Sequence, residues 1–197
     1  AAGAIPSILS EALAVTFDNH IGHDYLEDYE ERYDFYHQKE EKIPFDLEFF
    51  NKITKGGLPN KTLNVALAGT GVGKSLFMCH CASSVLLQGK NVLYITLEMA
   101  EEKIAERIDS NLLNCDIQNI TELPKMMFEN KVTNIAKKTQ GKLVIKEYPT
   151  ASAHVGHFRA LLNDLALKKS FKPDIIYIDY LNICASSRYS KLGNVNS

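Results

Sequence analysis

A run of small residues that ends in a lysine and a serine is the first part of this sequence to suggest chemistry. It reads Ala68, Gly69, Thr70, Gly71, Val72, Gly73, Lys74 and Ser75, which fits the Walker A pattern with alanine in place of the first glycine. Glycines let a backbone curl until its N–H groups point inward toward phosphate oxygens, and a helix N-terminus adds positive dipole character. We expect Lys74 to reach the β- and γ-phosphates of a nucleotide and Ser75 to bind Mg²⁺. The alternative is a glycine-rich turn with an incidental lysine.

Two carboxylates stand at the ends of other apolar segments. Asp179 closes the run IIYID and has the position of a Walker B aspartate, which holds Mg²⁺ through its water shell. Glu98 follows the run YITL and is a candidate general base that orients and deprotonates a water. The alternatives are an aspartate that caps a loop and a glutamate that caps the next helix. Because parallel sheets bind ligands at the carboxyl edge of their strands, we expect both carboxylates to converge on Lys74.

The segments around these residues alternate between strand-like and helix-like patterns. Apolar runs predict strands over 62–69, 91–99, 142–149 and 174–183. Helical spacing predicts helices over 45–53, 74–87, 101–113, 124–139 and 153–169. Apolar strands joined by helical crossovers predict an α/β fold, in which a parallel sheet is covered by helices on both faces. The first strand and the helix after it would carry the glycine-rich loop.

The chain before this core has a different character. Residues 1–17 include apolar positions at helical spacing and predict a helix, which we expect to pack on something outside the core, a neighbouring subunit being one candidate. Residues 18–43 are acidic, rich in tyrosine and poorly periodic, which predicts a linker arm. Four tyrosines in the arm have near-helical spacing and favour a packing stripe: Tyr25, Tyr29, Tyr33 and Tyr36. The core is then expected over 44–184, with a polar loop over 185–197.

The bulk composition limits the class of protein. The 197 residues are 45% hydrophobic and 23% charged with a net charge of −2, which is typical of a soluble globular chain and excludes a basic DNA-coating protein. No apolar run is long enough to cross a bilayer, so no membrane role is expected. Four cysteines without a CxxC pair or a secretory leader favour a reduced, cytoplasmic protein.

Two clusters of potential metal ligands have simpler interpretations. Cys79, His80 and Cys81 are adjacent, but they lack the other half of a zinc site and favour small hydrophobic residues in a buried helix. His154 and His157 are three residues apart at the start of a predicted helix, without a cysteine or carboxylate near them in sequence. We expect neither cluster to bind a metal.

Three stretches together resemble the RecA-like helicases of the DnaB type, including the replicative helicases of T-even-like bacteriophages. They read GGLPNKTLNVALAGTGVGKS, LYITLEMAEEKIAERI and IIYIDYLNI, and the resemblance runs from Phe45 to Cys184. The helix of residues 5–17 resembles the linker helix of that family. The resemblance implies ATP or another NTP with Mg²⁺, and a hexameric ring that holds nucleotide between subunits. It also implies single-stranded DNA in the ring's centre, a primase and a helicase loader as partners, and a bacterial host cytoplasm.

The resemblance also implies roles for single residues. Lys74 and Ser75 become the phosphate and Mg²⁺ ligands, Glu98 the catalytic carboxylate and Asp179 the Walker B aspartate. Asn182 stands where the family usually has a glutamine that senses the γ-phosphate. Asparagine is one methylene shorter, and a polar residue at a strand end is the alternative.

The end of the chain departs from the family pattern. The sequence stops at Ser197, whereas the family's arginine finger lies further along, so we expect an incomplete core that hydrolyses ATP weakly by itself. The last residues resemble the start of a DNA-facing loop, in which Arg188 and Lys191 would contact phosphates; a solvated tail is the alternative. Two other functions stay open: a RecA- or KaiC-like ATPase in recombination or regulation, and a module that binds nucleotide for assembly without turnover.

Overall fold

A computed structural model describes residues 22–185, and the chain divides into two units between Glu41 and Lys42. The expected helix over 1–17 lies outside the described residues, as do Arg188 and Lys191. In the first unit, helix α2 (Tyr29–His37) follows a turn in which the Asp24 carboxylate accepts hydrogen bonds from the next residues' backbone. Helix α2 has no buried residue, and the tyrosines of the expected packing stripe are exposed within this unit.

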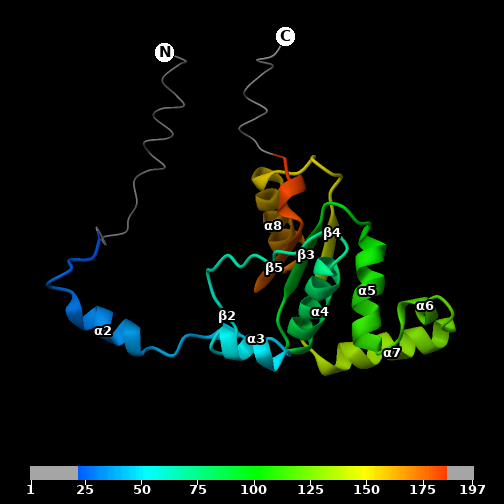
Figure 1. Cartoon of the computed structure of the whole chain (residues 1–197), viewed down its shortest axis with the longest axis horizontal. Helices are drawn as coiled ribbons and strands as arrows, with labels where there is room; N and C mark the ends of the chain where they lie inside the picture. The colour runs from blue at the N-terminus through cyan, green and yellow to red at the C-terminus, as the bar shows by residue number, and fades with distance from the viewer. Residues whose placement is uncertain (1–21, 186–197) are drawn as a thin grey trace, which may run out of the picture. The chain divides into compact units, whose positions relative to one another are not determined.

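A three-stranded parallel sheet forms the centre of the second unit (Figure 1). It consists of β3 (Val92–Thr96), β4 (Leu143–Glu147) and β5 (Ile175–Asp179), in the order β4-β3-β5. Every residue of β3 is buried, as a central strand covered on both faces requires. Val92 and Tyr94 point to one face and Leu93 and Ile95 to the other, because successive side chains alternate along a strand.

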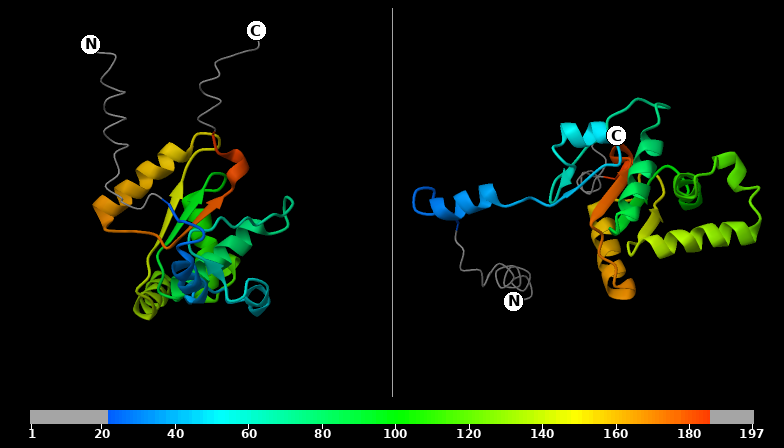
Figure 2. Two further views of the ribbon diagram at one scale, coloured as in Figure 1. Left: turned by 90° about the vertical axis from the view of Figure 1, so that its left-hand side faces the viewer. Right: turned by 90° about the horizontal axis from the view of Figure 1, so that it is seen from below.

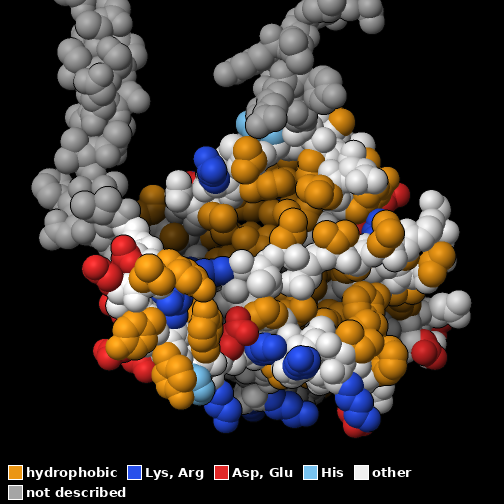
Figure 3. All heavy atoms as spheres, turned by 60° about the vertical axis from the view of Figure 1, so that its left-hand side comes forward, with side chains coloured by type: hydrophobic (Ala, Val, Ile, Leu, Met, Phe, Trp, Pro, Cys, Tyr) orange, Lys and Arg blue, Asp and Glu red, His pale blue; other side chains and the backbone are white. Residues whose placement is uncertain are grey.

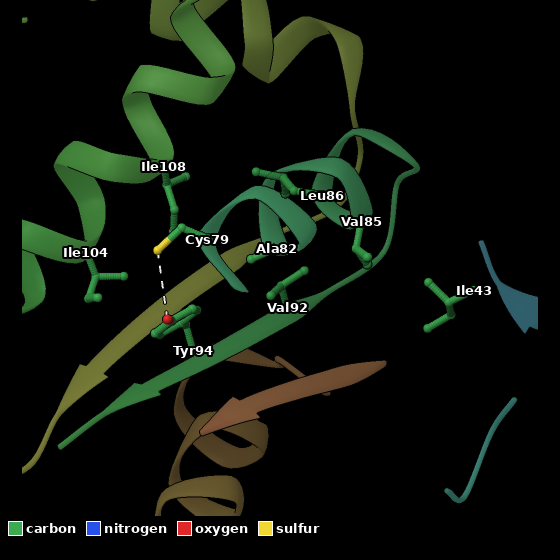
Figure 4. Packing of buried hydrophobic residues seen from close by; sticks show 9 residues of the cluster. All are labelled: Ile43, Cys79, Ala82, Val85, Leu86, Val92, Tyr94, Ile104 and Ile108. Atoms are coloured by element: carbon green, nitrogen blue, oxygen red, sulfur yellow. Dashed lines mark hydrogen bonds between the residues drawn. The ribbon is translucent and has the colours of Figure 1, made fainter. Parts of the chain in front are cut away.

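Helices cover both faces of this sheet, as the sequence predicts (Figure 2). On one face, α4 (Lys74–Leu87) and α5 (Glu101–Leu113) pack on Val92 and Tyr94 through a cluster that Figure 4 shows in close-up. On the other face, α8 (Val155–Lys169) and Phe171 pack on Leu93 and Ile95. The helices α4 and α5 begin and end where the periodicity predicts, since each has a buried apolar stripe.

The strand expected over 62–69 is absent, and this prediction is wrong. Residues 60–73 form an irregular loop in which Leu63, Val65 and Leu67 are 86%, 74% and 95% exposed. Alternating apolar residues suit a strand, but a strand forms only when a neighbour accepts its backbone hydrogen bonds. Within residues 22–185 no strand pairs with this segment, and β5 pairs only with β3. Figure 3 shows hydrophobic side chains gathered over a hollowed area of the surface.

Shorter elements complete the second unit. β1 (Lys42–Ile43) pairs antiparallel with β2 (Leu58–Pro59), and the loop between them contains α3 (Glu48–Ile53). Gly57 has φ of 122°, and a Cβ at this position would clash with the Ile43 carbonyl oxygen, so only glycine fits there. α6 (Ile117–Ile120) and α7 (Lys125–Lys138) lie between α5 and β4. None of the helices described in the chain could cross a membrane.

Candidate functional site

The backbone of the glycine-rich loop has the conformation that its sequence predicts. Gly71 and Gly73 have φ values of 76° and 101°, in the left-handed region that favours glycine. Gly73 is the N-cap of α4, and its carbonyl oxygen accepts the first helical hydrogen bond from Phe77 N at 2.9 Å. The N–H groups of Lys74, Ser75 and Leu76, which come before Phe77, have no intrahelical partner and remain available to an anion. Residues 68–72 are exposed, so the loop is open to a ligand.

Lys74 and Asp179 meet at the end of this loop. The Lys74 Nζ lies 3.9 Å from Asp179 Oδ1 and 3.8 Å from the centroid of the Tyr180 ring. Asp179 is only 2% exposed, and the Lys74 side chain is partly buried. The lysine therefore supplies the positive charge that a buried carboxylate requires. This is the approach of Lys74 to a strand-end carboxylate that the sequence predicts.

The two oxygens of the Asp179 carboxylate differ. Oδ2 accepts a hydrogen bond from the Tyr94 hydroxyl at 3.0 Å, whereas buried Oδ1 has no hydrogen-bond partner in the described part of the chain. A buried acceptor without a donor is costly unless something binds it. An oxygen ligand next to a phosphate-binding loop suits Mg²⁺, which prefers carboxylates, hydroxyls and water. The Asp179 carboxylate thus fits a ligand for a magnesium ion, and Ser75, in the first turn of α4, is the second candidate ligand.

Tyr94 is a member of this site that the sequence reasoning missed. Burial raises the pKa of its hydroxyl, with the nearby Cys79 and Asp179 adding to the effect, so the group stays protonated and donates. The signal was present, since a tyrosine in the middle of a buried strand needs a partner for its hydroxyl. Tyr94 pairs with Tyr177 in the ladder, and Asp179 lies two residues further along on the same face.

Glu98 lies at the same edge of the sheet, just beyond β3. Thr96, the register partner of Asp179, donates through its hydroxyl to Met99 O at 2.8 Å and accepts from Met99 N at 3.1 Å. This closed turn leaves Glu98 exposed. Among the described residues no ion pair joins Glu98 to Lys74. Glu98 is therefore free to face a water or a ligand at this edge.

The remaining predicted site residues are positioned less tightly. Ser75 is half-buried in the first turn of α4, next to Lys74. Asn182 is exposed and belongs to a short 3-10 helix (Leu181–Ile183), because β5 ends at Asp179 rather than at 183 as predicted.

The two clusters of potential metal ligands make contacts within the fold. His154 is the N-cap of α8: its ring accepts from Gly156 N at 3.0 Å, while its own N–H donates to the His157 ring at 3.2 Å. Cys79 and Cys81 are buried in α4. The searched residues contain no group of three or more ligand side chains that could hold a metal ion.

The comparisons with known proteins agree with this geometry. Residues 43–196 match the family model "DnaB-like helicase C terminal domain". The chain is 48% identical over 189 residues to the "DnaB-like replicative helicase" of Enterobacteria phage T4, which covers 94% of this chain and 40% of that relative. It is also 32% identical over 95 residues to the "DNA repair protein RadA" of Campylobacter jejuni. That match covers 48% of this chain and 21% of the relative. The chain thus spans less than half the length of either relative. Since the family model covers most of the chain, this protein belongs to the family of DnaB-like helicase C-terminal domains.

Proposed function

We propose that this chain is the ATP-hydrolysing motor domain of a replicative DNA helicase. The observation that carries the proposal is the approach of Lys74, from the glycine-rich loop, to buried Asp179 at the end of β5. A lysine and a carboxylate at one edge of a sheet are the groups needed to bind a nucleoside triphosphate and its metal ion. The identity to the phage T4 helicase over nearly the whole chain supports replication as the process.

Each residue then has a defined task in the site. The N–H groups of the loop and the Lys74 ammonium bind the phosphates, while Ser75 and Asp179 hold the metal ion. A magnesium ion held there would supply positive charge that offsets the charge on the phosphoryl group. Glu98, exposed at the same edge, orients a water and accepts its proton. Asn182, exposed shortly after Asp179, is the candidate residue for sensing the γ-phosphate.

The assembly that we propose is a hexameric ring around single-stranded DNA. The exposed glycine-rich loop supports a nucleotide site that a neighbouring subunit completes. A net charge of −2 limits each chain to a local DNA contact, but six copies of one loop with Arg188 and Lys191 would line a channel. The helix over 1–17 would pack on the adjacent subunit. A primase and a loader in the host cytoplasm complete the proposed set of partners.

DNA repair is the second candidate process. The similarity to the repair protein RadA covers about half of the chain, so the same nucleotide chemistry would also serve that process. The two candidates differ in what hydrolysis drives, because a replicative helicase separates the strands of a fork.

The test measures ATP hydrolysis by the intact protein with and without single-stranded DNA, and then its unwinding of a forked duplex. We expect DNA to stimulate hydrolysis, and Glu98→Gln to bind ATP normally while losing about 10²- to 10⁴-fold in rate. Glu102→Gln, on the exposed face of α5, is the matched control and should hydrolyse normally. DNA-stimulated hydrolysis without unwinding would favour the repair process. ATP binding without any turnover would leave a nucleotide-dependent assembly module.

A further inference from the structure

The Tyr94 side chain links the hydrophobic core directly to the Asp179 carboxylate. Its ring is fully buried among residues of α4 and α5, including Cys79, Ile104 and Ile108 (Figure 4). Its hydroxyl lies 3.0 Å from Asp179 Oδ2. The ring also stacks on Tyr177, its register partner, with 5.9 Å between centroids and 22° between planes. Packing on every side therefore fixes where the hydroxyl points.

The direction of each hydrogen bond in this chain of contacts is also fixed. The Tyr94 O–H donates to Asp179 Oδ2, because its hydroxyl is the donor and the carboxylate oxygen accepts. The Cys79 thiol, 3.8 Å from the hydroxyl oxygen, then donates to the lone pair that remains. Among the described residues the Tyr94 hydroxyl donates to no other acceptor. A movement of this hydroxyl would weaken its hydrogen bonds with both Asp179 and Cys79.

This contact determines how the carboxylate is turned. With Oδ2 bound to Tyr94, Oδ1 is the oxygen that faces Lys74 at 3.9 Å and has no hydrogen bond within residues 22–185. We propose that Tyr94 is a positioning residue, which holds the Asp179 carboxylate so that Oδ1 stays directed at the metal ion of the nucleotide site. The inference rests on the proposed function, since it assumes that this site binds a nucleotide with Mg²⁺. Partners of this kind orient metal-binding carboxylates, and their loss typically weakens metal affinity by about 10- to 100-fold.

The experiment removes a single oxygen. Tyr94→Phe keeps the ring and its packing but deletes the donor to Asp179. Tyr177→Phe is the matched control, because it deletes the hydroxyl of the other ring in the same stack, for which the described residues offer no hydrogen bond to Asp179. ATP binding to the full chain is measured by calorimetry, first in excess EDTA and then across a Mg²⁺ titration. Binding of Mn²⁺ in the presence of ATP is followed by electron paramagnetic resonance.

For Tyr94→Phe we expect unchanged ATP affinity in EDTA and a metal requirement raised by about ten-fold in both metal titrations. Tyr177→Phe should stay within about two-fold of the wild-type protein. In an Asp179→Asn background, Tyr94→Phe should have no further effect on the metal requirement, because it acts through that carboxylate.

Three results would overturn the inference. An unchanged metal requirement in Tyr94→Phe would refute it while leaving the proposed function intact. If Tyr94→Phe weakens ATP binding in EDTA as much as it does with Mg²⁺, its effect does not depend on the metal ion, and Tyr94 is a packing residue only. A wild-type chain whose ATP binding does not respond to metal would refute both the inference and the metal-dependent site on which it rests.

Discussion

The ammonium group of Lys74 lies between the Asp179 carboxylate and the face of the Tyr180 ring, 3.9 Å from the first and 3.8 Å from the centroid of the second. One lysine thus has two partners from consecutive residues at the end of β5. A cation over an aromatic face is attracted by the ring's quadrupole, and the carboxylate adds its full charge. Lys74 is consequently important to the folded domain as well as to the proposed phosphate binding.

Replacing Lys74 with alanine should therefore have two effects. Nucleotide binding or turnover should be lost, because the phosphates no longer meet a positive charge. The free energy of unfolding should also fall by about 1–3 kcal/mol, since buried Asp179 is left without its cation. ATP binding and urea denaturation measure the two effects separately. Lys103→Ala, which removes an exposed lysine paired with Glu106, is the control and should change neither.

The close approach of β2 to β1 makes Gly57 sensitive to any side chain. Gly57→Ala should destabilise the domain by more than Gly56→Ala, although both residues have left-handed φ values of 122° and 107°. The added Cβ at Gly57 would meet the Ile43 carbonyl, whereas nothing lies within 4 Å at Gly56. Each substitution carries a backbone cost of about 1–3 kcal/mol, so their difference in urea denaturation isolates the clash. Equal losses would mean that β1 moves aside freely.

The histidine pair at the start of α8 should respond as a helix cap and not as a metal site. His154→Ala should lower the free energy of unfolding by about 1 kcal/mol, because Gly156 N loses its acceptor. His154→Asn restores a capping side chain and should recover most of that loss. Thermal unfolding measures both variants. A rise in melting temperature when Zn²⁺ is added, absent in His154→Ala, would contradict this interpretation.

The four cysteines should differ in reactivity. Burial raises the pKa of the Cys79 thiol and raises that of Cys81 to about 12, so neither forms thiolate in the folded protein at neutral pH. Iodoacetamide at pH 8 should therefore modify Cys115, which is half-buried, well before Cys79 and Cys81, and mass spectrometry of the digested protein measures the order. Fast labelling of Cys81 in the folded chain would contradict its burial.

The same shift affects stability at high pH. The unfolded Cys81 thiol ionises near 9.0, whereas the folded one ionises near 12. Its contribution to the free energy of unfolding is therefore fully present below pH 9 and is lost as pH rises toward 12.

The features that the sequence predicted correctly depend on local patterns. The bounds of α4 and α5 follow from a glycine just before Lys74 and from apolar positions on one helical face. The position of Asp179 follows from the rule that parallel strands present ligands at one edge, and Lys74 reaches it from the start of α4 although the strand expected before the loop is absent. Each of these inferences needs only neighbouring residues and a general property of sheets.

The features that were missed depend on partners that a pattern does not name. Residues 62–69 alternate as a strand would, but nothing in those residues specifies a neighbouring strand. The contact of Tyr94 with Asp179 requires the register of β3 against β5, and a one-residue change of register would turn Tyr94 to the other face. Register is set by packing across the whole sheet, so it is visible only in the structure.

The unpaired edge of β5, close in sequence to exposed Leu181, has a consequence for handling the protein. Its backbone N–H and C=O groups pair with no further strand in residues 22–185, and Leu63, Val65 and Leu67 are exposed in the same unit. An open edge accompanied by apolar side chains is a template on which other chains can add strands. We therefore expect this edge, rather than the modest net charge of −2, to limit the concentration at which the domain stays free of aggregates.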